Sequence, residues 1–295
     1  MRLPPKSTTA LAMDPEREDD GTDPAPRPVR IPLSQAVVRG IDMHRQLRDP
    51  TMDPSRTRVI RRDDDMPIVG EELTSMGEMY VADDGGALRT FNGRQAHENG
   101  WWPSRKRGRL LHWQGSAQRN AVLRIESDFK VNWAQTEARR FHFTLGGRRR
   151  KYTCDLEVDM FDQPTEIWEV KRDDRALEDP DYRLTLAGVD EICRRIGMRF
   201  RIVMADEIFE NRWHRDNVEL FASRRFVSID RDHMRRFEGY AMSHGDRTTY
   251  GELAAAIAPG CAARGKAMIQ GLTVLRRVEI DLVHRLTDRT PVIIH

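Results

Sequence analysis

Two stretches, Tyr152-Thr153-Cys154-Asp155-Leu156 and Trp168-Glu169-Val170-Lys171, decide which fold the sequence predicts. In both, apolar and polar residues alternate, as they do in a strand with one buried face. We expect the first stretch to lie in a strand from Arg148 to Met160 and the second in a strand from Glu166 to Lys171. The longer strand is predicted to carry on one side Tyr152, Cys154, Leu156, Val158 and Met160.

The neighbouring sequence completes an α/β pattern. Apolar residues at helical spacing predict a helix from Ser116 to Glu126, with Ala117, Ala121, Val122 and Ile125 on one face. A strand from Arg140 to Leu145 ends at Gly146-Gly147, a hairpin signal. Further along, a helix from Leu184 to Ile196 and a strand from Arg199 to Met204 are predicted. The order helix, three strands, helix, strand predicts an α/β domain with a mixed sheet.

The acids on the two central strands suggest metal-dependent chemistry. Asp155 and Glu169 on neighbouring strands can meet at one end of a sheet, where their oxygens suit Mg²⁺, with Mn²⁺ as an alternative. Glu169 and Lys171 are two residues apart, so both side chains point the same way. Lys171 would then place a positive charge where negative charge builds during phosphodiester hydrolysis.

A simpler interpretation competes with this one. Acid-x-Lys triplets are common in a chain in which 33% of the residues are charged. Asp155, Glu157 and Asp159 would then form only the solvated face of an amphipathic strand. The ordered set of helices and strands around the three residues favours the nuclease interpretation.

A second group of elements follows Ile208. Short helices are predicted at Val218–Phe226, Met234–Met242, Tyr250–Ile257 and Gly265–Arg277, and short strands at Val278–Leu282 and Pro291–Ile294. Helices followed by a terminal hairpin are typical of a winged helix. Its candidate recognition helix, Lys266 to Arg277, is mostly apolar between its basic ends, which favours protein contact over DNA contact.

The ordered motifs resemble those of TnsA-type transposon endonucleases, which carry a PD-(D/E)xK nuclease domain. The resemblance rests on His112-Trp113, on the run from Arg149 to Asp155 and on Trp168 to Lys171. It continues through Glu178-Asp179-Pro180 and the C-terminal helices, and covers roughly residues 101–294. It implies a restriction-endonuclease-like mixed sheet with flanking helices, followed by a small winged-helix domain. It also implies action on DNA together with a DDE transposase and an AAA+ ATPase regulator.

Family members carry a metal-ligand glutamate on the first helix, and the ungapped alignment places Gln118 there. The resemblance thus implies a catalytic set of Asp155, Glu169, Lys171 and Gln118, with the Val170 carbonyl as a further metal ligand. A carboxamide offers a neutral oxygen, so we expect weaker metal binding. Glu157, about 7 Å along the strand from Asp155, is the candidate substitute. Cys154 stands where the family usually has proline.

Two basic runs are candidate DNA contacts, because phosphate contacts supply most sequence-independent affinity. The first precedes the predicted helix and consists of Arg105, Lys106, Arg107 and Arg109; the second enters the Asp155 strand and consists of Arg148, Arg149, Arg150 and Lys151. For the second run, an exposed hairpin tip is an equal alternative.

The bulk composition sets limits on these interpretations. The chain has 295 residues, a net charge of +2 and three widely spaced cysteines, which exclude a disulfide framework. No apolar run approaches the roughly 20 residues of a membrane helix, and no signal peptide is evident, so we expect a cytoplasmic protein without a membrane partner.

The predicted organisation has three parts. Residues 1–100 are expected to form a largely disordered extension, with a short amphipathic helix or a transient one at Pro32–Leu47. Residues 101–208 are predicted to form the nuclease-like domain, and residues 209–295 the winged-helix-like domain.

Three functions agree with these observations. The first is a TnsA-like endonuclease that hydrolyses phosphodiesters at transposon ends. The second is a catalytically inactive adaptor of the same complex, which Gln118 favours and the intact Asp155, Glu169 and Lys171 oppose. The third is a restriction or phage-defence nuclease that shares the fold.

Overall fold

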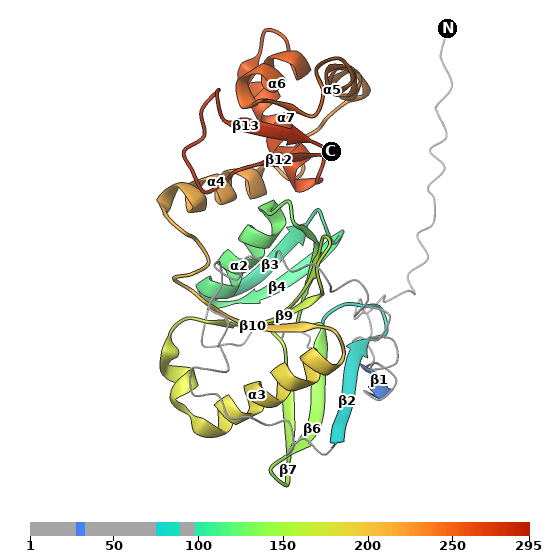
Figure 1. The fold of residues 1–295 in the computed structure, drawn as a ribbon, viewed down its shortest axis with the longest axis vertical. Helices are drawn as coiled ribbons and strands as arrows, with labels where there is room; N and C mark the ends of the chain where they lie inside the picture. Colours follow the sequence, from blue (N-terminus) through green and yellow to red (C-terminus); the bar gives the residue numbers. More distant parts are fainter. Residues whose placement is uncertain (1–27, 33–74, 89–97) are drawn as a thin grey trace, which may run out of the picture.

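The computed structural model of the chain describes residues 28–32, 75–88 and 98–295. The described residues form a mixed α/β structure with several sheets and flanking helices (Figure 1). Within them, no helix is long and apolar enough to cross a membrane. The predicted helix at Pro32–Leu47 lies outside the described residues, except for Pro32 itself, which ends a strand.

The first sheet has four antiparallel strands in the order β1-β2-β6-β7. Their bounds are Pro28–Pro32, Ser75–Ala82, Arg139–Leu145 and Arg148–Thr153. The β6–β7 turn is Gly146-Gly147, as predicted, and both glycines have positive φ, which other residues rarely adopt. The strands β1 and β2 differ from the expectation for residues 1–100, because they extend the sheet that β6 and β7 form.

The second sheet has the order β10-β9-β8-β5, with β9 and β10 parallel and the other pairs antiparallel. The bounds are Arg199–Met204 for β10, Glu166–Lys171 for β9, Leu156–Met160 for β8 and Val131–Thr136 for β5. Strands β9 and β10 match the prediction. Strand β5 was not predicted, because its apolar and polar residues do not alternate.

The predicted strand from Arg148 to Met160 is two strands, and this prediction was wrong. Strand β7 ends at Thr153 in the first sheet, and β8 begins at Leu156 in the second. The backbone N–H of Cys154 donates to Arg139 in the first sheet, whereas the N–H of Asp155 donates to Trp168 in the second. The side chains before and after this crossover therefore do not share one face.

Two helices cover different faces of the sheets. Helix α2 (Gly115–Ser127) packs in a core with Leu156, Trp168 and Val170, and helix α3 (Pro180–Arg195) packs in another core with Tyr152 and Ile167. Adjacent residues of β9 thus point into different cores, as the alternating pattern predicted. A short 3-10 helix, η1 (Asp174–Glu178), precedes α3, whose first turn is capped by the carboxylate of Asp179.

A hairpin missed by the sequence analysis precedes α2. Strands β3 (Asn99–Ser104) and β4 (Arg109–Gln114) pair with each other. Buried Glu126 accepts hydrogen bonds from the backbone N–H of Arg105 and from the Ser104 hydroxyl. The ammonium of Lys106 donates to the carbonyls of Ile125, Asp128 and Val131, where the last carbonyls of a helix need donors. Burial lowers the pKa of Lys106 to about 8.

The C-terminal part contains four α-helices and a three-stranded sheet. The helices are α4 (Arg212–Ser223), α5 (Arg231–His244), α6 (Tyr250–Ile257) and α7 (Ala262–Val274). The sheet has the order β11-β13-β12, with bounds Arg247–Thr249, Pro291–Ile294 and Val278–Ile280. The predicted helices and terminal strands of this region are confirmed within about three residues, except that α4 begins six residues before the predicted start at Val218. Strand β11 is an addition.

The C-terminal part packs directly on α2 through the same hydrophobic core (Figure 1). Helix α7 is buried from Met268 to Val274. Arg276, just after it, donates to the Phe129 carbonyl and to the Asn132 side chain. The candidate recognition helix therefore lies inside the structure, and its basic end is used for an internal contact.

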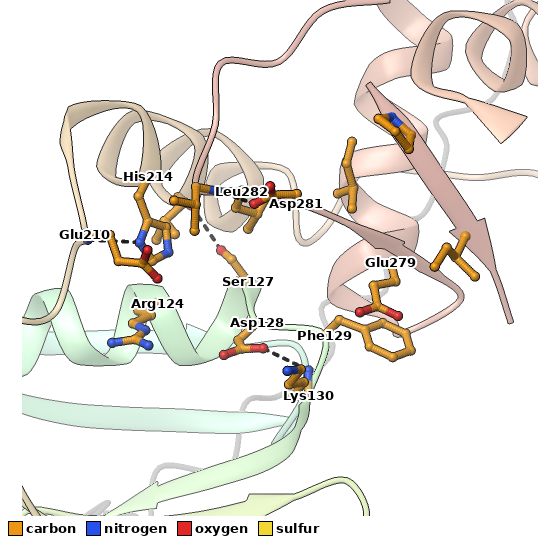
Figure 2. Close-up of a pocket in the computed structure, with 15 residues that line it drawn as sticks. Arg124, Ser127, Asp128, Phe129, Lys130, Glu210, His214, Glu279, Asp281 and Leu282 are labelled. Carbon is orange, nitrogen blue, oxygen red and sulfur yellow. Dashed lines mark hydrogen bonds between the residues drawn. The ribbon is translucent and has the colours of Figure 1, made fainter. Parts of the chain in front are cut away.

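A cavity of about 360 Å³ lies at this interface, between the end of α2, the start of α4 and strand β12. Figure 2 shows Arg124, Asp128 and Lys130 on one side and His214, Glu279 and Asp281 on the others. The Ser127 hydroxyl donates to the Val218 carbonyl and joins α2 to α4 across it.

The contacts of Lys106 predict a stability effect. In Lys106→Met the carbonyls of Ile125, Asp128 and Val131 lose their donor, which should lower the free energy of unfolding by about 3 kcal/mol. Urea unfolding measures this. The exposed neighbour Arg105, replaced by Met, is the control and should change stability by less than about 0.5 kcal/mol. Equal stability of Lys106→Met and the wild type would contradict this role.

Candidate active site

The crossover between the two sheets places Asp155 beside the end of strand β9. Its carboxylate accepts a hydrogen bond from the Val170 backbone N–H at 2.7 Å and another from the Gln118 side-chain amide at 2.7 Å. Three predicted site residues, from the crossover, a strand and a helix, therefore meet here. Sequence reasoning placed Gln118 at this site from helical spacing and alignment, and the side chain does lie there.

Glu169 lies on strand β9, and its side chain is almost completely buried, at 6% exposure. One carboxylate oxygen accepts from the Tyr152 hydroxyl at 2.6 Å. The other is 2.5 Å from both the Tyr182 hydroxyl and the Lys171 ammonium. The predicted pairing of Glu169 and Lys171 on one face is confirmed.

Tyr182 was missed by the sequence analysis. It lies in the first turn of α3, and the Lys171 ammonium lies 4.8 Å from the centre of its ring. Its closeness to β9 results from the packing of α3 on the sheets. Nothing in the local sequence pairs Tyr182 with Glu169; the only signal was the helix start at Asp179-Pro180.

The orientation of the Gln118 amide is set by its second contact. Its oxygen accepts from the backbone N–H of Gln114 at 2.8 Å, so its NH₂ group faces Asp155. The sequence analysis expected the amide oxygen to be a metal ligand. In this arrangement the oxygen points to the start of α2, and ligation would require the amide to rotate and lose the Gln114 contact.

The electrostatics at Asp155 are unfavourable for a negative charge. Burial raises the pKa of Asp155 well above its usual range, and the neighbouring Glu169 carboxylate raises it further. The Val170 N–H and the Lys171 ammonium act in the opposite direction. Buried Glu137, which was not singled out from the sequence, adds negative charge nearby.

The two tyrosines remain donors at this site. Burial and the Glu169 carboxylate raise the pKa of Tyr152 and of Tyr182 above the usual value. Both hydroxyls therefore keep their protons at neutral pH and hold the Glu169 carboxylate in place.

The site offers few anionic oxygens for a divalent cation. In the described part of the chain, no cluster of three or more His, Cys, Asp or Glu side chains could hold a metal. Asp155 and Glu169 supply two carboxylates, and Mg²⁺ is commonly bound by one or two carboxylates together with water and substrate phosphate. The pair therefore fits Mg²⁺ bound with substrate, and it does not make a cage formed by protein alone.

Glu157, the predicted substitute ligand, is used elsewhere. It is buried and forms an ion pair with Arg139 of β6. Because the strand breaks at Cys154–Asp155, Asp155 and Glu157 are not two positions of one regular strand. The structure therefore gives Glu157 a partner in the first sheet rather than at the Asp155 site.

The predicted DNA-contact residues fall into two groups. Four make internal contacts: Lys106 as above, Arg107 with the Gly85 carbonyl and the Trp133 ring, Arg109 with Asp84, and Arg150 with Asp181 and Thr185. The other four are exposed: Arg105, Arg148, Arg149 and Lys151. Within β7, Arg149 and Lys151 point outward and Arg150 points inward, as strand alternation requires.

Neither comparison with protein-family models nor comparison with curated proteins finds a match for this chain.

Asp155 already lies near the acids Glu169 and Glu137, so Gln118→Glu should change both the stability of the protein and its response to divalent cations. A third carboxylate beside Asp155 should lower the melting temperature without divalent cations, because like charges oppose one another when buried. It should also enlarge the rise in melting temperature on adding Mn²⁺, because a ligand that binds the folded state stabilises it.

Thermal unfolding with and without Mn²⁺ measures both effects. Gln163→Glu, in the β8–β9 turn, is the control with the same change of charge and should show neither effect. A cation-induced shift equal to that of the wild type would contradict the placement of Gln118 at a cation site.

Proposed function

We propose that the chain is a metal-dependent nuclease of the PD-(D/E)xK class, with a restriction-endonuclease-like sheet arrangement. The observation that carries the proposal is that two contact pairs lie side by side: Asp155 accepts a hydrogen bond from Gln118, and Glu169 pairs with Lys171. Glu169 and Lys171 are both close enough to Asp155 to shift its pKa, although the four residues come from a crossover, a strand and a helix. This is the set that the sequence motifs predicted. Asp155 also holds a destabilised negative charge, as expected of a carboxylate that binds a cation or substrate.

The site residues can supply two things that phosphodiester hydrolysis needs: ligands for a cation and a positive charge beside the phosphate. A bound divalent cation lowers the pKa of a water and offsets charge on the phosphate. Asp155 and Glu169 would hold it, and the Val170 carbonyl remains a proposed further ligand. Lys171, fixed by Glu169 and the Tyr182 ring, would steady the negative charge that builds on the phosphate.

Within this class, we propose a TnsA-like endonuclease that acts on transposon ends with a DDE transposase and an AAA+ regulator. The support is the order of the resembling motifs, from His112-Trp113 to Trp168–Lys171. The C-terminal helices and the β11-β13-β12 sheet also agree with the winged-helix layout that the resemblance implies. Because α7 is buried, protein contact is the role we propose for this part.

A non-catalytic adaptor is the second candidate, and one observation favours it. Hydrogen-bond donors of the protein already contact both acids: Asp155 with Gln118 and Val170, and Glu169 with both tyrosines and Lys171. The site is thus compatible with a folded protein that never binds a cation. Its DNA and partner contacts would then be its function.

Cleavage of transposon-end DNA in Mg²⁺ and in Mn²⁺, with the proposed partners present, separates the candidates. We expect the wild type to nick the DNA, and Asp155→Ala and Lys171→Met each to lower the rate by about a hundredfold or more. Asp174→Asn, an exposed acid on η1, is the control and should retain the wild-type rate.

The outcomes have distinct meanings. Equal rates in the wild type and Asp155→Ala would contradict the catalytic assignment. No cleavage by the wild type, with cleavage gained in Gln118→Glu, would favour the adaptor and identify the amide as the cause of inactivity.

A further inference from the structure

The outer face of the first sheet is separated from its inner face by strict alternation. On β6, Phe141, Phe143 and Leu145 are buried, and they pack with α3 in one core. The intervening residues of β6 and their partners on β7 point the other way. In the register, His142 is opposite Lys151 and Thr144 is opposite Arg149. These four side chains therefore share the face of the sheet that α3 does not cover.

This outer face is hollowed rather than flat. A cavity of about 460 Å³ is lined there by Glu78 and Tyr80 of β2, His142 and Thr144 of β6, and Arg149 and Lys151 of β7. A break in the β2–β6 register between Ser75 and Glu78 lies beside it. Gly77 in this break has a φ of +69°, and a Cβ there would meet the His142 carbonyl, so only glycine fits.

Positive side chains outnumber negative ones on this face. Arg149 and Lys151 are exposed, and Arg140, on the same face of β6, contacts the Thr153 hydroxyl. Within the cavity lining, Glu78 is the acid, and its carboxylate accepts from the Tyr80 hydroxyl at 2.7 Å. The face thus carries an excess of positive charge, which attracts phosphates.

His142, which lines the cavity, also has a buried ring nitrogen. The Nε2 of His142 has no hydrogen-bond partner in the described part of the chain. The His142 ring packs on Tyr80 at a centre-to-centre distance of 4.6 Å, which fixes its orientation. Buried ring nitrogens are nearly always hydrogen-bonded, so this nitrogen lacks a partner that such atoms usually have.

We propose that this outer face binds the phosphate backbone of DNA, with Arg149 and Lys151 as the main contacts and Arg140 as an additional one. Two features favour a DNA strand over a small anion: the cations are spread over two neighbouring strands, and β7 leads directly to Asp155 at the crossover. The inference deepens the proposed function, and it rests on that proposal for taking DNA as the ligand. Arg150 is not one of the proposed DNA contacts, because its side chain points inward and pairs with Asp181.

The salt dependence of DNA binding tests the inference. Fluorescence anisotropy with a labelled 30-base-pair duplex in EDTA, where no cleavage occurs, gives the dissociation constant at several salt concentrations. Each lost phosphate contact should reduce the slope of log affinity against log salt by about 1, so Arg149→Ala/Lys151→Ala should reduce it by about 2.

Arg231→Ala/Arg289→Ala is the matched control. It removes the same charge from exposed positions of the C-terminal part, and its slope should equal that of the wild type. Both double variants change exposed side chains, and matching melting temperatures would show that they are folded.

The results separate this inference from the proposed nuclease activity. DNA binding with an unchanged slope in Arg149→Ala/Lys151→Ala would overturn the inference and leave the nuclease proposal standing. A reduced slope in a protein that never cleaves DNA would support the inference and overturn the nuclease proposal. No DNA binding by the wild type would overturn both.

Discussion

The site depends on the crossover of one chain segment from the first sheet to the second at Cys154–Asp155. Two backbone hydrogen bonds set it: Cys154 donates to Arg139 in one sheet, and Asp155 donates to Trp168 in the other. Because of this change of partner, the Asp155 carboxylate can accept hydrogen bonds from the Val170 N–H and from the Gln118 amide. A segment that continued in one sheet would lack this junction with β9 and α2.

Helix α2 connects this crossover to the rest of the molecule. Near its start, Gln118 contacts Asp155. At its end, Glu126 and the carbonyls capped by Lys106 hold the β3–β4 hairpin, while Ser127 contacts α4. Helix α2 shares a core with both the second sheet and the C-terminal helices, so it holds the site and the C-terminal part together.

The sequence predicted the elements whose patterns are local. Strands β9 and β10 alternate or form short apolar runs and were predicted with their observed bounds. Strand β5 was missed because residues on both of its faces are buried, which removes the alternation. The crossover at Cys154 was missed because alternation does not say which sheet a strand joins.

The same limit applies to the site. The spacing in the sequence predicted that Asp155, Glu169 and Lys171 lie together, but the tyrosines around Glu169 and the orientation of the Gln118 amide depend on long-range packing.

We propose that Asp155 and Glu169 together bind a divalent cation when substrate phosphate is present. Anomalous diffraction from crystals of the protein bound to a DNA duplex and soaked in Mn²⁺ tests this proposal most directly. We expect one strong anomalous peak in contact with oxygens of both carboxylates, with the Gln118 amide displaced from Asp155. A peak away from these carboxylates, or no peak at a high Mn²⁺ concentration, would contradict cation binding by this pair.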